Sequence, residues 1–265
     1  MKDQLSLKLN NKEFSFSNEE THWLLTNIGN ENPEIRDYLV FSLFAQGIRT
    51  GGFTEEQFHL ISETTISNNL IFYQLNNHLP ETLTRSFSAL LNGLIIEADG
   101  KTDSPYYHLL SEKNREYFFE AAIAYFYKET DTCGFSEEYG WVHGFAHGAD
   151  FLSQIVAHDL FPKERLVEVL EAVQFVMFNL ESPFIEGEDR RIAHILYSSL
   201  SKVENSQEVI YEWISGLDFP LIENKDFYRL AMFENMLASL YFHSLETDIL
   251  EKDLKELMLS YLKNY

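Results

Sequence analysis

The chain has 265 residues, of which 42 are acidic and 20 are basic, giving a formal net charge of −22. This excess of negative charge excludes nucleic acid as a partner, because affinity for nucleic acid depends on neutralising phosphates with Lys and Arg. The same charge disfavours binding to anionic membrane surfaces. Hydrophobic residues make up 45% of the chain, which is enough for a sizeable buried core.

Helical patterns begin early in the chain. Ser17 to Glu20 form a capping box before HWLLTNIG, and Thr54 to Gln57 form a second one before the helix TEEQFHLISET. Pro33 stands at the start of NPEIRDYLVFSLFAQGI, a helix that two glycines should stop. The segment ETLTRSFSALLNGLIIEAD has apolar residues on a 3.6-residue period, which predicts another helix. Only SLKLNNKEFSF, near the first residue, indicates strands, as a small hairpin turning at two asparagines.

The rest of the chain continues the helical pattern. The predicted helices are SEKNREYFFEAAIAYFYKET, GWVHGFAHGADFLSQIVAHD, PKERLVEVLEAVQFVMFNL, GEDRRIAHILYSSLSK, NSQEVIYEWISGL, NKDFYRLAMFENMLASLYFHSL and ILEKDLKELMLSYLK. Short polar segments join them, and no Pro- or Ser-rich linker marks a domain boundary. We therefore expect one α-helical domain over residues 1–265.

About a dozen helices in short succession predict an all-α fold. Helix pairs recur about every 40 residues, the size of a helical-hairpin repeat, although the residues themselves do not repeat. A helical bundle is one interpretation. We favour a right-handed superhelix of stacked antiparallel helix pairs, because amphipathic helices joined in order tend to stack on their nearest neighbours. The concave face of such a stack is the usual binding surface.

The cysteine content and the apolar runs bear on the compartment. The chain has one cysteine, Cys133, so it forms no disulfide within itself and no thiolate metal cluster. The segment MKDQLSLKLNNKEFSF lacks the apolar core of a secretory signal. No apolar run approaches the roughly 20 residues that span a bilayer. These features predict a soluble protein of the cytoplasm, with no membrane partner.

One segment, YGWVHGFAHGADFL, places two imidazoles and a carboxylate in an apolar helical pattern. In a helix running from Gly140 to about residue 158, His143, His147 and Asp150 would share one strip, because residues three and four apart stack. The apolar stripe that packs on neighbouring helices would lie elsewhere. Gly144 and the glycine four residues later weaken a helix by about 1 kcal/mol each, so a close helix neighbour or space for another group must compensate.

Three interpretations of this strip remain open. Two histidines four residues apart can chelate a divalent metal, and Asp150 could complete the site. The H-E-x-x-H motif of zinc hydrolases is absent, because Gly144 follows the first histidine. The histidines could instead bridge two packed helices by donating to carbonyls or carboxylates, or they could bind a ligand. Trp141 is then either an aromatic wall of the site or a core residue.

A second polar segment is EGEDRRIAHILYSS, residues 186 to 199. Its acids, Asp189 among them, stand at a helix start, where they complement the helix dipole. Arg191 could pair with acids of preceding helices or meet an anionic ligand. No catalytic group can be assigned here, because Ser198 and the histidine one turn before it have no aspartate to complete a triad. Ser86 likewise lacks the sequence context of a nucleophile elbow.

The pattern D-x-x-G-F-S-x-x-x-G-W-x-H-x-x-A-H-x-A-D-x-L, from Asp131 to Leu152, resembles the signature of an uncharacterised bacterial family, DUF2785. The E-D-x-R motif at 188–191 and the segment TRSFSAL at 84–90 are similar to two further motifs of that family. The resemblance covers about residues 80 to 200 and implies an armadillo/HEAT-like helical superhelix without an established activity. Cys133 stands where the family pattern has an arginine, so no role of that arginine carries over.

Two functional hypotheses follow. The first is a cytoplasmic binding or scaffold protein that holds a peptide, a protein or a small molecule in a groove. The groove would be lined by Trp141, His143, His147, Asp150, Asp189 and Arg191. The second is a metal-dependent hydrolase with His143, His147 and Asp150 as ligands and an acid of residues 186–189 as the base. The sequence requires no cofactor, and only the second hypothesis needs a divalent metal.

Overall fold

The computed structural model describes residues 1–263, and within them the chain is all-α apart from one two-stranded antiparallel sheet. The elements are α1 (Lys2–Asn11), α2 (Asn18–Thr26), η1 (Glu34–Phe41), α3 (Ser42–Thr50), α4 (Glu55–Ser67), η2 (Leu70–Phe72), α5 (Glu81–Gly100), α6 (Glu112–Lys128), β1 (Phe135–Ser136), β2 (Gly140–Trp141), α7 (Gly144–Ala157), η3 (Lys163–Arg165), α8 (Leu166–Phe178), α9 (Glu188–Lys202), α10 (Ser206–Ser215), α11 (Asn224–Ser244) and α12 (Lys252–Leu262). The element η1 is π-helical, whereas η2 and η3 are short 3₁₀ helices.

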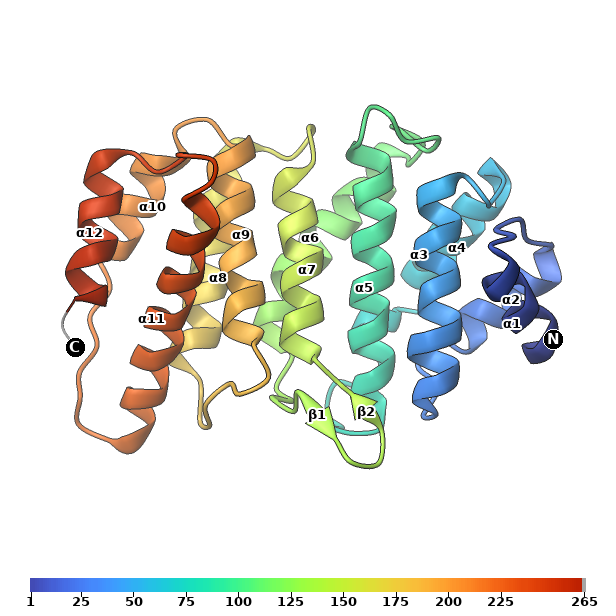
Figure 1. Ribbon diagram of the computed structural model, residues 1–265, viewed down its shortest axis with the longest axis horizontal. Coiled ribbons are helices and arrows are strands. Elements are labelled where there is room, and N and C mark those ends of the chain that lie inside the picture. The colour runs from blue at the N-terminus through green and yellow to red at the C-terminus, as the bar shows by residue number, and fades with distance from the viewer. Residues whose placement is uncertain (264–265) are drawn as a thin grey trace.

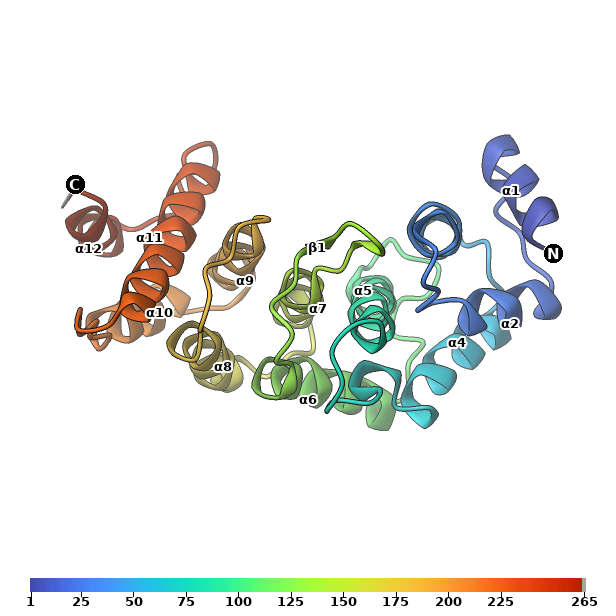
Figure 2. The same ribbon diagram turned by 90° about the horizontal axis from the view of Figure 1, so that it is seen from below.

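The helices form two rows that run the length of the molecule (Figure 1). In one row α3, α5, α7, α9 and α11 pack side by side, and in the other α4, α6, α8 and α10 follow one another. Seen from below, the stack curves into an arch, with α5, α7 and α9 on its inner side and α6 and α8 on its outer side (Figure 2). The predicted all-α superhelical arrangement is confirmed. It presents the inner row of helices on a concave face.

Local sequence signals set several helix boundaries. The Ser17 hydroxyl accepts a hydrogen bond from the Glu20 amide, and the Glu20 carboxylate accepts one from the Ser17 amide, which completes the first predicted capping box. Thr54 and Gln57 complete the second in the same way. Gly51 ends α3 in the left-handed conformation, with φ of 72°, where a side chain would be strained. These helix ends therefore follow from residues close in sequence.

The hairpin predicted for SLKLNNKEFSF, residues 6–16, is wrong, because residues 6–11 belong to the helix α1 and residues 12–16 form no strand. The alternation of polar and apolar residues in SLKL, residues 6–9, suggested a strand. In the structure Leu5 is fully buried and Leu9, four residues later, packs against the same core, whereas Leu7 is 61% exposed. Packing of a helical i, i+4 pair therefore prevailed over the period-two pattern.

The interior is one cluster of buried apolar side chains that extends from Leu5 in α1 to Met258 in α12. Glycine permits a close helix contact within it. A Cβ atom at Gly148 would lie 2.6 Å from the Tyr125 ring, so α6 and α7 approach closely at this residue. A Cβ atom at Gly144 would meet its nearest neighbour at 3.4 Å, which is an ordinary contact. Gly148, and not Gly144, is thus the position where a close helix neighbour compensates for the glycine.

Among residues 1–263, none of the helices combines the length and the apolarity that spanning a bilayer requires.

Candidate functional site

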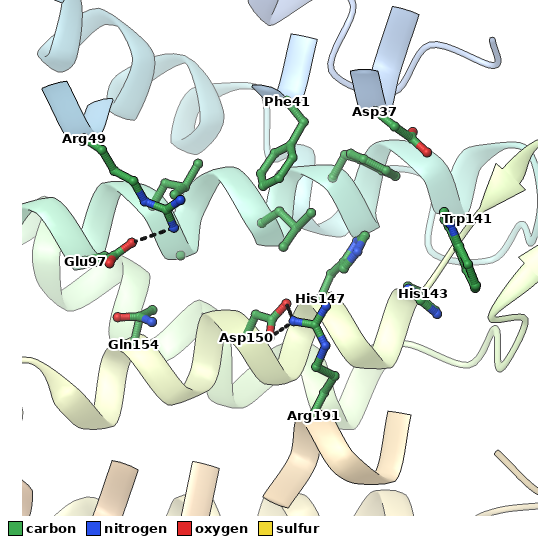
Figure 3. A pocket seen from close by; sticks show the side chains of 14 residues that line it. Asp37, Phe41, Arg49, Glu97, Trp141, His143, His147, Asp150, Gln154 and Arg191 are labelled. Atoms are coloured by element: carbon green, nitrogen blue, oxygen red, sulfur yellow. Dashed lines mark hydrogen bonds and ion pairs between the residues drawn. The ribbon is translucent and has the colours of Figure 1, made fainter. Parts of the chain in front are cut away.

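A groove of about 610 Å³ lies on the inner row of helices, between η1 and α3 on one side and α9 on the other (Figure 3). The helices α5 and α7 form its floor. Its lining residues are Asp37, Phe41, Arg49, Phe87, Leu90, Gly93, Leu94, Glu97, Trp141, His143, His147, Asp150, Gln154 and Arg191. The volume lies in the range of sites that hold small organic ligands.

The helix that carries the histidines begins later than predicted. Gly140 and Trp141 form strand β2, paired antiparallel with β1, and α7 starts only at Gly144. The carbonyl of Gly134 accepts hydrogen bonds from the Val142 and His143 amides, which holds this segment outside the helix. The prediction of a helix from Gly140 is therefore wrong, because contacts with the preceding loop outweigh the local helical pattern.

His143 consequently caps α7 instead of lying within it. Its backbone is left-handed, with φ of 49°, a conformation that is uncommon for a residue other than glycine. Its Nε2 atom is enclosed and has no hydrogen-bond partner within residues 1–263. The predicted strip on one helix thus contains His147 and Asp150 alone, although His143 still lines the same groove.

The imidazole of His147 is held in one orientation by α5. Its Nδ1 lies 2.7 Å from the Ser86 hydroxyl, and that hydroxyl also contacts the carbonyl of Val142. A carbonyl can only accept, so the Ser86 hydroxyl donates to Val142 and accepts from an Nδ1–H group of His147. In the neutral ring this places the lone pair on Nε2. Ser86 itself is fully buried and its proton is engaged, so it does not act as a nucleophile.

Burial lowers the pKa of His147 well below its ordinary value, and the charges of Arg191 and Arg36, and of His143 when that ring is protonated, lower it further. Burial and the charge of Arg191 also lower the pKa of His143. Both rings are therefore neutral at pH 7. They lie edge to face, with ring centroids 5.5 Å apart.

Asp150 joins α7 to α9 through an ion pair. Arg191 Nη1 lies 2.7 Å from both carboxylate oxygens of Asp150 (Figure 3). Burial raises the pKa of Asp150, and the Arg191 charge opposes that rise. The guanidinium side chain is 47% exposed, and its Nε and Nη2 atoms donate to no acceptor within the described part of the chain. Arg191 can therefore still donate to a ligand in the groove.

Trp141 forms one end of the groove and is not a core residue, since it is 48% exposed. Its indole stacks on the His143 ring with centroids 4.6 Å apart, and the Phe135 ring meets it edge to face. Behind it, the fully buried Arg36 of η1 donates from Nη2 to the carbonyls of Tyr139, at 2.7 Å, and Trp141, at 3.1 Å. Arg36 thus ties the β1–β2 hairpin to η1.

Asp189 lies apart from the other predicted site residues. It is buried at the start of α9, where its carboxylate accepts a hydrogen bond from the Arg190 amide. It lines a separate pocket that also includes Gly187 and His243. The remaining predicted residues, Trp141, His143, His147, Asp150 and Arg191, all line the groove. Asp189 acts as a helix-start residue, which is the simpler of the two roles that its position suggested.

Several lining residues had no signal in the sequence. Asp37 and Phe41 come from η1, and Arg49 comes from α3. All three precede the first residue of α5 by more than thirty residues. Only the stacking of helices brings them to α7. Gln154 differs from these residues, because helical spacing from the sequence places it on the strip of His147 and Asp150 along the same helix.

Two of the three proposed metal ligands already have partners within the protein. Asp150 places both oxygens on Arg191, and His147 uses Nδ1 toward Ser86. Within residues 1–263 no group of three or more His, Cys, Asp or Glu side chains is arranged to hold a metal ion. The geometry therefore does not favour a centre formed by His143, His147 and Asp150.

The lowered pKa of His147 has a consequence for stability. Protonation of His147 is less favourable in the folded chain than in the unfolded chain, where this histidine titrates near pH 6.5. The contribution of the neutral His147 ring to the free energy of unfolding is therefore complete above pH 6.5 and is lost as the pH falls below 6.5. Between pH 7.5 and 5.5 we expect His147 to account for a loss on the order of 1 kcal/mol in the free energy of unfolding. Urea unfolding of the wild type and of His147→Phe at both pH values measures this contribution.

The comparison between proteins isolates His147 from other titrating groups. Burial also lowers the pKa of His194 and raises that of Glu188, and these residues remain in both proteins. His22→Phe, at an exposed position of α2, is the control and should keep the wild-type pH dependence. An unchanged dependence in His147→Phe would show that the ring is protonated as readily in the folded chain as in the unfolded one.

Comparison with known proteins identifies the family. The model of the family described as a protein of unknown function (DUF2785) matches residues 71–242, well over half of the chain. The matched range contains most of the groove, including α5, α7 and the hairpin before α7. Neither the comparison with curated proteins nor that with solved structures gave a significant match. By this match, and by the motifs at 84–90, 131–152 and 188–191, the chain belongs to the DUF2785 family.

Proposed function

We propose that the protein is a binding protein that holds a small organic ligand or a short peptide segment in the groove between η1, α3, α5, α7 and α9. One observation carries this proposal: apolar side chains and incompletely engaged polar groups line the same depression on the concave face. Phe41, Phe87, Leu90 and Leu94 supply the apolar surface. His147 and Arg191 supply polar atoms toward it.

This combination matches what small-molecule sites require. Apolar lining provides most of the binding free energy, and a few fixed polar groups set the orientation of the ligand. Here His147 is fixed by Ser86, and Arg191 is fixed by Asp150. Arg191 keeps donors without an acceptor in residues 1–263, and these donors remain available to a ligand in the groove.

Binding is favoured over hydrolysis by the roles that the polar groups already have. Ser86, the hydroxyl that contacts a histidine, is enclosed and donates its proton to a carbonyl. The proposed metal ligands do not converge. A hydrolase would need an activated nucleophile close to a general base.

Blocking the groove tests this proposal. Leu90 lies on its floor in α5, and Leu90→Trp should fill part of its volume. Ligand-observed NMR with a library of small organic fragments compares the wild type with this variant. Leu7→Trp, at a 61% exposed position of α1, adds the same indole far from the groove and is the matched control.

We expect a subset of fragments to bind the wild type and Leu7→Trp equally and to bind Leu90→Trp at least about tenfold more weakly. Thermal unfolding of the three proteins shows whether each remains folded. If folded Leu90→Trp binds the same fragments as the wild type, or if no fragment binds the wild type, the groove is not a binding site.

A further inference from the structure

Resting on the proposed binding groove, we infer that its ligand is a small organic carboxylate with a neutral donor beside the carboxylate. In this arrangement the carboxylate lies at Arg191, and an adjacent hydroxyl or amide N–H donates to Nε2 of His147. The apolar part of the ligand lies over Phe87 and Leu90. This chemistry is shared by hydroxy acids, N-acyl amino acids and the carboxyl end of a peptide.

The first step is that His147 accepts and does not donate in the groove. The chain of hydrogen bonds from His147 Nδ1 through the Ser86 hydroxyl to the Val142 carbonyl fixes the proton on Nδ1. No described residue provides a hydrogen-bond partner for Nε2. His147 lines the groove and is 6% exposed. A ligand atom that meets this nitrogen must therefore carry a proton.

The second step is that this proton comes from a neutral group. The fully buried Arg36 lies 4.6 Å from the Phe87 ring, which in turn contacts the His147 ring at 5.1 Å. Arg191 of α9 also extends toward His147 (Figure 3). An ammonium group at Nε2 of His147 would be repelled by these two guanidinium groups, whereas a hydroxyl or an amide N–H would not.

The third step is that the carboxylate of the ligand belongs at Arg191. Each acid of the groove already has a cation. Asp150 has Arg191 itself, Asp37 lies 2.7 Å from Arg36 Nε without hydrogen-bond alignment, and Glu97 contacts Lys101 and Arg49. Arg191 still has Nε and Nη2 available, since no acceptor within residues 1–263 takes them. A carboxylate is the group that suits two adjacent guanidinium donors.

The position of the ligand carboxylate at Arg191 is specific, because the chain as a whole is strongly acidic. A net charge of −22 repels anions from most of the surface. At this end of the groove, however, the positive charge of Arg191 acts on both histidines and lowers the pKa of each. The groove therefore selects an anion by the placed donors of Arg191 and not by a general positive field.

Matched pairs of probes test the inference. The first pair is 3-phenyllactate and 3-phenylpropionate, which differ only in the hydroxyl beside the carboxylate. The second is N-acetyl-phenylalanine and a peptide of four residues ending in phenylalanine, which distinguish a free small acid from a peptide end. Phenethylamine tests the opposite charge. Isothermal titration at pH 7.5 gives the dissociation constant of each probe.

In the wild type we expect 3-phenyllactate to bind about tenfold more tightly than 3-phenylpropionate, and phenethylamine not to bind. His147→Phe keeps the ring and removes the acceptor, so it should abolish the difference between the two acids without weakening 3-phenylpropionate. Arg191→Gln should weaken both acids by about tenfold or more. Arg190→Gln, the neighbouring exposed arginine outside the groove lining, is the control and should change neither.

The outcomes separate the inference from the function on which it rests. If fragments are lost from Leu90→Trp but phenethylamine binds the wild type as well as the acids, the groove binds ligands and the inference is wrong. The inference is also wrong if His147→Phe still binds 3-phenyllactate more tightly than 3-phenylpropionate. If the peptide binds more tightly than N-acetyl-phenylalanine, the ligand is a peptide end; equal or weaker binding indicates a free small acid. If folded Leu90→Trp binds the fragments as well as the wild type does, both the proposed binding groove and this inference are overturned.

Discussion

Replacing Arg85 with Met is expected to lower the free energy of unfolding by about 3–5 kcal/mol, the cost of leaving a buried carboxylate without its partner. Arg85 of α5 and Glu129, which follows α6, are both fully enclosed, with Nε 2.7 Å from one carboxylate oxygen and Nη2 3.0 Å from the other. The Nη1 atom donates to the carbonyls of Tyr73 and Asn77, each at 3.0 Å. Met fills a similar volume but provides none of these donors.

Chemical denaturation of three variants checks this expectation. Arg165→Met removes an arginine that pairs with three acids, all more than half exposed, and should cost less than about 1 kcal/mol. The double variant Arg85→Met, Glu129→Gln removes both buried charges and should recover part of the loss. If the single and double variants are equally unstable, the lost carbonyl contacts account for the cost and the unpaired charge does not.

The sequence predicted the helices well where their signals are local. The capping boxes at Ser17 and Thr54 and the apolar period of α5 depend on residues within one or two turns. The two errors, at residues 6–16 and 140–143, have the opposite cause. Leu5 packs into a core built by distant helices, and Gly134 holds the amide of His143 outside the helix. Neither contact can be read from the pattern of the segment itself.

The same distinction applies to the candidate site. His147 and Asp150 share a helix, so their proximity follows from their spacing. One of the predicted alternatives was that Arg191 pairs with an acid of a preceding helix. In the structure this acid is Asp150. By contrast, Ser86 and Arg36 control the orientation of His147 and the position of Trp141, and both act through stacking of helices. The sequence thus predicted most groups that face the groove but not those that fix them.

Replacing Arg36 with Met is the second change for which we expect a large effect, about 3 kcal/mol or more in the free energy of unfolding. Arg36 is fully buried in η1, and it donates to the carbonyls of Asn30, Tyr139 and Trp141. Its loss removes this donor from each of these carbonyls and leaves Asp37 without its neighbouring cation. Because the hairpin of Tyr139 and Trp141 is held through this side chain, the change should also loosen one end of the groove.

Two readouts distinguish lost stability from a loosened groove. In a chain where Trp23 and Trp213 are replaced by Phe, Trp141 is the remaining tryptophan, and acrylamide quenching reports its accessibility. At low denaturant, where the protein is folded, Arg36→Met should increase quenching. Arg49→Met is the matched control: this arginine also lines the groove, but it is 57% exposed and lies 3.4 Å from Glu97, so its loss should cost less than about 1 kcal/mol and leave quenching unchanged. A destabilised Arg36→Met with wild-type quenching would mean that other contacts hold the hairpin, and that the shape of the groove does not depend on η1.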